Sequence, residues 1–419
     1  MKKNRLLIFL FFLILFIDGW GQEPLLLSLK QAEDLAIQNN YQLNASLHRL
    51  EQGYYSYKSS QAYFKPKVAF SSELSIGQDQ HGLDSVLRLT QPLYDRVAFY
   101  NLKESQIQWE IARLDVQQQI CDLLFQVREA YYTILLNQAH LAVDQVIINL
   151  WEEEIKRQER YLALGTSIPF ELNQAKLHLK GAWSDYHTTQ GKIKSSRISL
   201  LKILGILPDT VFDLTEQEIP LPPLQWQEYP LDQWRQWAFC YRPQLKQEQF
   251  FYLLSQNKVC RAKAENTPSL SAYANAGHHY VNNGFDGQPY IGLGVNVDWT
   301  LYDPTNKPRI RQAKEESKEA ASNYYQSELE ANAIIDDLLN EIEKFYLVYL
   351  NAQEGCALAE EGMQMATKKH QLGMMSSFEY RDAIKTLHEA RQQINQAKFD
   401  LRNAYDRLIQ QVGLDLKPH

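Results

Sequence analysis

The sequence predicts a mainly helical fold with a small β part, formed by two structural repeats in one exported chain. Apolar residues recur every seven positions over long stretches, a pattern typical of helices that wind around their neighbours as a coiled coil. Short segments instead alternate apolar and polar residues, which is typical of half-buried strands. Several residue patterns also occur twice, at offsets of 202 or 208 residues.

Composition excludes several classes of protein. The chain of 419 residues is 45% hydrophobic, which is too apolar for a disordered protein, and its formal net charge of -7 gives no basic surface for nucleic acid. Four cysteines are too few for a disulfide scaffold, and none has a metal-ligand spacing, so we expect buried free thiols. No nucleophile elbow, phosphate loop or HExxH motif occurs, so we expect no enzyme activity, metal or cofactor.

Residues 1–21 have the pattern of a secretory signal peptide. Basic residues precede an apolar run over residues 6–17, and Gly19 and Gly21 are the small residues of a cleavage site. The run is short for a membrane-spanning helix, which needs about 20 residues, although an N-terminal anchor is the alternative. No later apolar run approaches that length, so we expect a soluble exported protein or one that spans a membrane with strands.

The repeats are expected over residues 22–206 and 231–413. A Pro-rich, ordered but non-helical connection over 207–230 joins them, and residues 414–419 form a tail. Equivalent positions share residues: Leu29 and Leu231, Gln31 and Gln233, Pro66 and Pro268, Leu93-Tyr94-Asp95 and Leu301-Tyr302-Asp303, Gly165 and Gly373, Phe170-Glu171 and Phe378-Glu379. Each repeat is therefore expected to contain a helix, a strand pair, a very long helix, a tip turn and a further helix.

The long helix of the first repeat is predicted from about Val97 to Leu164, where no Pro or Gly occurs. At 1.5 Å per residue such a helix reaches roughly 100 Å, which suits a tube or strut rather than a compact globule. Apolar heptad positions follow it and the last helix: Ile120, Val127, Ile134, Leu141, Ile148, Ile155 and Leu162, then Tyr380, Leu387, Ile394, Leu401 and Leu408. Most charged residues of these helices are expected on a solvated face.

The strand pairs are predicted over residues 66–93 and 268–301. The clearest alternation places five apolar residues on one face, with Gly, Asn and Asp between them: Ile291, Leu293, Val295, Val297 and Trp299. Strands of about ten residues also suit a tilted membrane strand, and aromatic residues gather near the strand ends. Four strands cannot close a barrel, so several chains would share one; a soluble hairpin with aromatic packing is the alternative.

Taken together, the sequence resembles the TolC family of outer-membrane efflux proteins of Gram-negative bacteria. The resemblance covers residues 27–413, and its specificity comes from the order and spacing of motifs that are weak singly. The motifs are Leu29-Lys30-Gln31-Ala32 with Asn39-Asn40, Pro66 before a strand, Gln91-Pro92-Leu93-Tyr94-Asp95 before the long helix, Leu164-Gly165 with Phe170-Glu171, and Leu372-Gly373 with Phe378-Glu379.

The resemblance implies a homotrimer with a twelve-stranded β-barrel in outer-membrane lipid, four strands per chain, continuous with a long α-barrel in the periplasm. It implies a channel rather than an enzyme, docked on an inner-membrane pump through a periplasmic adaptor or serving type I secretion. The tip residues expected to turn the chain and contact the adaptor are Gly165, Thr166, Ser167, Gly373, Met374, Met375 and Ser376. The transported compound does not follow from the sequence.

The resemblance also implies an acidic periplasmic entrance, which in this family lies just after the second tip. Glu379 and Asp382 occupy those places, so three copies would form two acidic rings. Glu171, the equivalent of Glu379 in the first repeat, is expected to make a restraining contact between coils. A basic residue that the family can have in the second tip loop is absent, and Arg381 is expected to contribute to closure instead. The alternative is that the two acids only occupy a first helical turn, where they favour the dipole.

Two other functions fit parts of the sequence. A periplasmic structural coiled-coil protein without channel activity would use the helices but not the strands, and an exported enzyme would use the helices as a scaffold. Five residues near the second tip could also form a soft-metal route, because thioethers suit Cu(I): Met363, Met365, Met374, Met375 and His370. We favour adaptable packing for these methionines.

Overall fold

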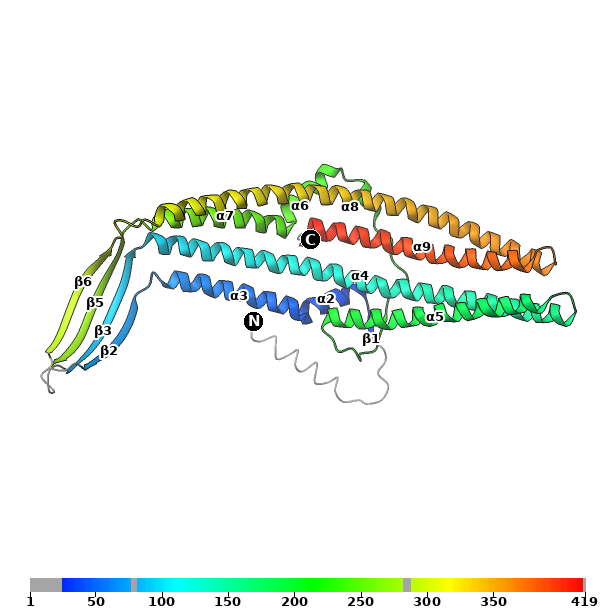
Figure 1. Ribbon diagram of the computed structural model, residues 1–419, viewed down its shortest axis with the longest axis horizontal. Coiled ribbons are helices and arrows are strands. Elements are labelled where there is room, and N and C mark those ends of the chain that lie inside the picture. The colour runs from blue at the N-terminus through cyan, green and yellow to red at the C-terminus, as the bar shows by residue number, and fades with distance from the viewer. Residues whose placement is uncertain (1–24, 77–80, 282–287, 417–419) are drawn as a thin grey trace. The chain divides into compact units, whose positions relative to one another are not determined.

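A computed structural model describes residues 25–76, 81–281 and 288–416; the expected signal peptide lies outside them (Figure 1). The first half contains β1 (Leu25–Leu27), α2 (Leu29–Asn39), α3 (Tyr41–Ala62), β2 (Lys67–Ile76), β3 (His81–Tyr94), α4 (Arg96–Ala163), α5 (Pro169–Leu204) and β4 (Phe212–Leu214). The second half contains η2 (Leu224–Gln227), α6 (Leu231–Tyr241), α7 (Pro243–Ala264), β5 (Ser269–Val281), β6 (Gln288–Asp298), α8 (Asn306–Gln371), α9 (Ser377–Val412) and η3 (Leu414–Leu416). The same helix and strand order occurs twice, which confirms the repeat.

The predicted single helix before each strand pair is wrong, because two helices lie there. In the first half, the side chain of Asn40 accepts hydrogen bonds from the amides of Gln42 and Leu43, so the chain ends α2 and begins α3 at this residue. In the second half, Pro243 disfavours a helical conformation at Arg242, which has extended backbone between α6 and α7. The connection expected to be non-helical contains the single 3₁₀ turn η2.

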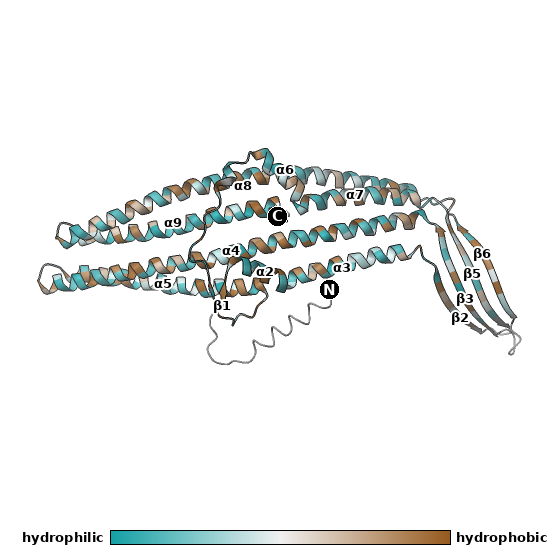
Figure 2. Ribbon diagram, turned by 180° about the vertical axis from the view of Figure 1, so that it is seen from behind, coloured by the Kyte–Doolittle hydropathy of each residue, from teal (hydrophilic) through white to brown (hydrophobic). Residues whose placement is uncertain are grey.

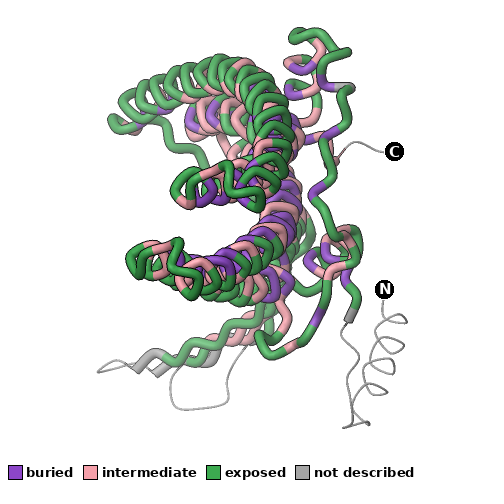
Figure 3. Tube along the Cα trace, turned by 90° about the vertical axis from the view of Figure 1, so that its right-hand side faces the viewer, coloured by how far each residue is buried: buried purple, intermediate pink, exposed green. Residues whose placement is uncertain are grey.

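The chain forms two compact units, and we describe each by itself. Unit 1 comprises the chain up to Asn39 together with Val127–Pro220 and Glu354–Phe399. Its apolar cluster joins α4, α5, α8 and α9: Val143, Ile147, Ile148, Trp151, Ala182, Met363, Ala366, Tyr380, Ile384 and Leu387. The cluster includes heptad positions predicted from sequence, and buried positions recur along the helices (Figure 3).

Unit 2 comprises Asn40–Gln126, Leu221–Gln353 and the chain from Asp400, and it contains an antiparallel sheet of order β2-β3-β5-β6. Apolar and polar residues alternate along the strands (Figure 2). Ile291 and Leu293 are 85% and 82% exposed, so the chain itself does not cover the apolar face of β6. On the opposite face, a Cβ added at Gly294 would lie 2.5 Å from Oη of Tyr273, its cross-strand partner.

Two glycines end α5 and α9 in the same way. Gly205 and Gly413 have φ of 68° and 79°, in the left-handed region that favours glycine. A Cβ added at Gly205 would lie 2.6 Å from the carbonyl oxygen of Asn39, at the end of α2. One added at Gly413 would lie 2.7 Å from that of Tyr241, at the end of α6. Each contact lies within one unit and fixes a long helix against a short one.

Candidate functional site

The two tip turns of unit 1 have the same backbone geometry. Gly165, after α4, and Gly373, after α8, have φ of 73° and 70°. The amides of the following residues, Thr166 and Met374, each donate to a carbonyl five residues back at 2.9 Å. These are the bonds of a Schellman motif, in which a left-handed residue ends a helix and reverses the chain. Leu164, Leu372 and Met374 are exposed there.

The tips differ in how the next helix begins. Ser376 and Glu379 form a reciprocal capping box: the amide of Ser376 donates to Glu379 Oε2 at 2.9 Å, and the amide of Glu379 donates to Ser376 Oγ at 3.2 Å. These hydrogen bonds from the amide and hydroxyl of Ser376 lower the pKa of the exposed Glu379 carboxyl. At the equivalent place before α5, Ile168 makes no side-chain cap bond. Ile168 therefore offers no side-chain hydroxyl to Glu171, the equivalent of Glu379.

Glu171 instead binds the other hairpin. Arg381 Nη1 on α9 donates to Glu171 Oε2 on α5 at 2.5 Å, and the Arg381 side chain is only 10% exposed. Asp382 is exposed and, with Arg381, lines a cleft of about 980 Å³ between α5 and α9, to which Phe170 and Phe378 contribute. The structure thus brings together Glu171 and Arg381 and directs Glu379 to its own helix cap.

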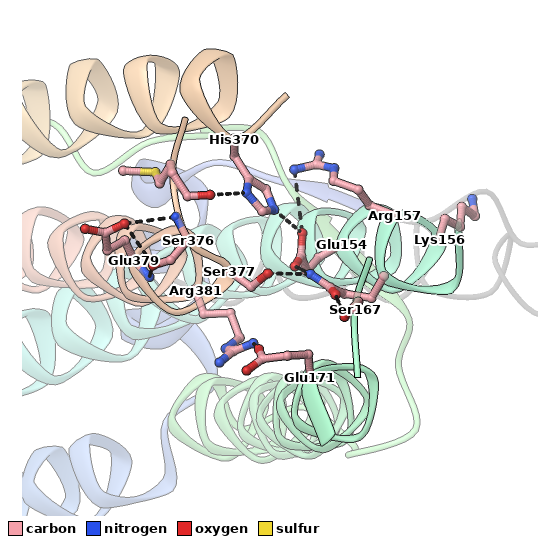
Figure 4. A network of polar contacts seen from close by, with 12 residues as sticks. Glu154, Lys156, Arg157, Ser167, Glu171, His370, Ser376, Ser377, Glu379 and Arg381 are labelled. Atoms are coloured by element: carbon pink, nitrogen blue, oxygen red, sulfur yellow. Dashed lines mark hydrogen bonds and ion pairs between the residues drawn. The ribbon is translucent and has the colours of Figure 1, made fainter. Parts of the chain in front are cut away.

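A buried polar cluster, hereafter the tip cluster, lies just inside both turns (Figure 4). It consists of Glu154, Gln158, Ser167, His370 and Ser377. Gln158 Nε2 lies 2.7 Å from both Glu154 Oε1 and Ser377 Oγ, while Ser167 Oγ donates to Gln158 Oε1 at 3.0 Å. His370 Nε2 lies 3.2 Å from Glu154 Oε2. Glu154 and Gln158 are fully buried, so α4 connects both tips through groups that water does not reach.

A second buried carboxylate lies further along α4. Asp144 accepts hydrogen bonds from Thr189 on α5 at 2.8 Å and from Gln392 on α9 at 3.3 Å, and His388 Nε2 lies 3.0 Å from it. Burial alone would raise the pKa of Asp144, but the bonds from His388 and Thr189 outweigh it and lower that pKa. We call these residues the Asp144 cluster; it joins three helices.

Sequence reasoning missed both polar clusters because it placed charged residues on solvated faces. A signal was present. Residues 144, 147, 151, 154 and 158 follow helical three- and four-residue spacing, so they share a face. Ile147 and Trp151 on that face are apolar and buried, whereas Asp144, Glu154 and Gln158 interrupt the apolar stripe with polar groups. Polar residues within a core stripe indicate buried partners.

The residues weighed for a soft-metal route near the second tip have different surroundings in the structure. Both ring nitrogens of His370 already face protein atoms, Glu154 Oε2 and the carbonyl oxygen of Met375. Met363 packs in the apolar cluster of unit 1, and Met365 and Met374 are exposed. Within the described ranges, no group of three His, Cys, Asp or Glu residues could hold a metal ion, and all four cysteines are free. Nor, in the same ranges, is any helix long and apolar enough to cross a bilayer.

Long helical hairpins with matched tips, and a sheet with one exposed apolar face, define a class of outer-membrane channel proteins. The chain belongs to the outer membrane efflux protein family, whose model matches residues 33–206 and 234–414. It is an exit duct of efflux or type I secretion systems, located in the outer membrane with a large periplasmic helical part. The gap in the match falls on the Pro-rich connection.

Individual relatives agree with this assignment. The chain is 20% identical to the alkaline protease secretion protein AprF of Pseudomonas aeruginosa, over 99% of this chain and 90% of that protein. The outer-membrane channel OprN has 16% identity and a TM-score of 0.80, covering 92% of this chain and 89% of its own. The Campylobacter jejuni outer membrane channel CmeC has 18% identity and a TM-score of 0.78, covering 92% and 85%. These relatives are channel and secretion proteins rather than enzymes.

Proposed function

We propose that three copies of this chain form one channel, with a twelve-stranded barrel in the outer membrane and a helical tube in the periplasm. The observation that supports this proposal best is the sheet β2-β3-β5-β6. Its apolar face is exposed, and in the described pairings β2 and β6 are edge strands. Open edges are not tolerated in lipid, so neighbouring chains must pair with them. The mature protein should fractionate with outer membrane and run as a heat-modifiable trimer; a monodisperse, detergent-free monomer would contradict this.

The tips are the proposed docking surface for a periplasmic adaptor, which connects the channel to an inner-membrane pump. Exposed apolar side chains at both turns support this role, because Leu164, Leu372 and Met374 are each at least 70% exposed. Single cysteines at Thr166, Ser167, Met374 or Met375 should crosslink to the adaptor in cells. Cysteines in the strand loops are the control, and crosslinks from the loops alone would refute the assignment.

The periplasmic entrance is proposed to be an acidic constriction to which Asp382 and Glu379 contribute, restrained by the Glu171–Arg381 ion pair. The exposure of the Asp382 side chain supports its contribution to the constriction, and the capping box gives Glu379 a second, structural role. Clustered acids attract cations, so the channel should prefer them and be blocked by multivalent ones. Single-channel recording of Asp382→Asn and Glu379→Gln, separately and together, is the test; unchanged conductance, cation preference and block in the double variant would exclude the constriction.

A further inference from the structure

The apolar face of the sheet ends at an aromatic residue, where β3 leads into α4 (Figure 1). A register shift between Pro92 and Tyr94 places Tyr94 opposite Leu270, and Leu270 in turn pairs with Val297, two residues from Val295 on the apolar face. Tyr94 is exposed. Tyrosine at the end of such a face is typical of the boundary between lipid hydrocarbon and headgroups. Where the strands span the outer membrane, the first turns of α4 therefore lie at headgroup level, on the periplasmic side.

The first turns of α4 present cations and aromatic rings on one face. Arg96, Phe99, Tyr100 and Lys103 follow helical three- and four-residue spacing, and all but the half-buried Tyr100 are exposed. Lys103 Nζ lies 4.8 Å from the centroid of the Phe99 ring and 6.0 Å from that of Tyr100. The guanidinium carbon of Arg96 lies 5.9 Å from the Tyr100 centroid. Cation–π contacts of this kind hold both charges close to the rings.

The other sides of α4 pack against neighbouring helices of unit 2. Ser105 Oγ lies 2.7 Å from Ser60 Oγ on α3, and Ala98 is buried. Arg261 Nη1 on α7 donates to the Glu104 carboxylate at 3.0 Å. The cationic face of α4 is thus the side that these packing contacts leave open.

The acidic groups nearest to this face already have partners. The Asp95 carboxylate accepts a hydrogen bond from the Tyr63 hydroxyl at 2.7 Å and another from an amide of the first turn of α4 at 2.8 Å. Glu104 is the carboxylate bound from α7. Among the residues that the structure describes, neither Arg96 nor Lys103 forms an ion pair with a carboxylate. The face therefore has an excess of positive charge that the chain itself does not neutralise.

The second repeat has the same imbalance of charge at the start of α8. Glu265 is bound by Arg309. Lys307 and Arg311 are exposed and, over the described part of the chain, form no ion pair with a carboxylate. Arg311 is equivalent to Lys103, at the offset of 208 residues that also relates the tip motifs. Both repeats thus place unneutralised cations next to the sheet.

We propose that the Arg96–Lys103 face of α4 binds the headgroup of an anionic phospholipid in the periplasmic leaflet of the outer membrane. The proposal rests on the membrane-spanning sheet proposed above. The two cations attract the phosphate of the headgroup, while the acyl chains lie along the apolar strand face that ends at Tyr94. A lipid is favoured over a free phosphate because the apolar face and the cationic face are continuous. The contact fixes how deeply the sheet lies in the bilayer.

The test is native mass spectrometry of the purified protein in detergent, with equal amounts of anionic phosphatidylglycerol and zwitterionic phosphatidylcholine added. Each cation near an anionic lipid strengthens binding roughly fivefold, so the wild type should retain phosphatidylglycerol over phosphatidylcholine by about tenfold or more. The preference should decrease with added salt, because the cations are exposed. Arg96→Gln combined with Lys103→Gln should bring the ratio of the two bound lipids close to one.

Two controls complete the test. Lys176→Gln combined with Lys192→Gln removes two exposed cations from α5 in unit 1 and should keep the wild-type ratio. Excess glycerol 3-phosphate, which has a phosphate but no acyl chains, should not displace phosphatidylglycerol; displacement would assign the site to a free phosphate and overturn the proposal. A wild-type ratio of one, or an unchanged ratio in the Arg96 and Lys103 double variant, would overturn it too. The same spectra give the mass of the assembly, so a monomer contradicts the proposed trimer independently of the lipid ratio.

Discussion

Glu171 and Glu379 occupy equivalent positions in the two repeats but bind different partners: Glu379 bonds its own helix cap at Ser376, whereas Glu171 bonds Arg381 on the other hairpin. The difference begins one turn earlier, where Ile168 replaces the capping serine. An acid that is not needed for capping is available for a contact between α5 and α9. The difference at a single cap position therefore accompanies different partners for the two acids.

Loss of the cap should destabilise the second tip. In Ser376→Ile, which copies the first repeat, α9 loses the hydroxyl that caps it, and the free energy of unfolding should fall by about 0.5–2 kcal/mol. Denaturant unfolding measures the change. The reverse substitution, Ile168→Ser, is the matched control and should leave stability equal or higher. Equal losses in both variants would show that the capping box contributes nothing.

The Glu171–Arg381 pair should couple α5 to α9. We expect Glu171→Gln and Arg381→Ala to be non-additive in a double-mutant cycle, by about 0.5–3 kcal/mol, because the two side chains are in direct contact. Each single variant should also increase the open fraction in single-channel recordings. Lys176–Glu159, an exposed pair at 4.0 Å that joins α5 to α4, is the control and should show little coupling. Additive effects at Glu171 and Arg381 would exclude the restraint.

Glycine should be required at positions 205 and 413, where α5 and α9 end. Gly205→Ala and Gly413→Ala place a Cβ in a left-handed residue and against a carbonyl oxygen, which should cost about 1–3 kcal/mol each. Gly191→Ala, within α5, adds a Cβ that meets nothing within 4 Å beyond its own helical backbone, and it should be neutral or stabilising because alanine favours helix. Thermal unfolding distinguishes the three. A tolerated alanine at Gly205 would contradict the described contact with Asn39.

The two faces of β6 should respond differently to charge. Val295→Lys puts a charge on the apolar face and should cost about 2–4 kcal/mol if that face meets the middle of a bilayer. Asn296→Lys changes the polar face and should be tolerated, with only the bond from Asn296 to Asp298 lost. Urea unfolding in lipid vesicles measures both. Equal losses of unfolding free energy in the two variants would mean that the apolar and polar faces are assigned wrongly.

Acid should weaken the Asp144 cluster. The pKa of the Asp144 carboxyl is lowered from the ordinary Asp value of 3.8. The cluster therefore contributes its full stability at pH values above 3.8, and this contribution is lost as the pH falls through the lower folded-state pKa. Asp144→Asn should be less stable at neutral pH and should lose less on acidification than wild type. The midpoint of thermal unfolding, followed from neutral to strongly acidic pH, measures the difference. Parallel curves for both proteins would refute the role of this carboxylate.

The long helices and the strand alternation could be predicted because each depends on local pattern. The absence of Pro and Gly and the heptads from Ile120 onward place α4 within one residue of its observed ends. The break at Asn40 was missed because the residues around this asparagine also fit a continuous helix, so the sequence pattern alone does not reveal the cap. The histidine partners of Glu154 and Asp144 lie on α8 and α9, over 200 residues away, and no local pattern specifies such pairings.

In the proposed trimer, the sheet edges at β2 and β6 determine how the protein is assembled. If edges of different chains pair, the last folding step is a collision between chains, and its rate increases steeply with their concentration. Helical parts satisfy their own backbone and need no such collision. A newly exported chain would therefore wait with completed helices and an unfinished sheet, whose exposed strands can pair with unrelated proteins. Slow export should then favour aggregation or degradation, and a periplasmic chaperone that shields strands should raise the yield of finished channels.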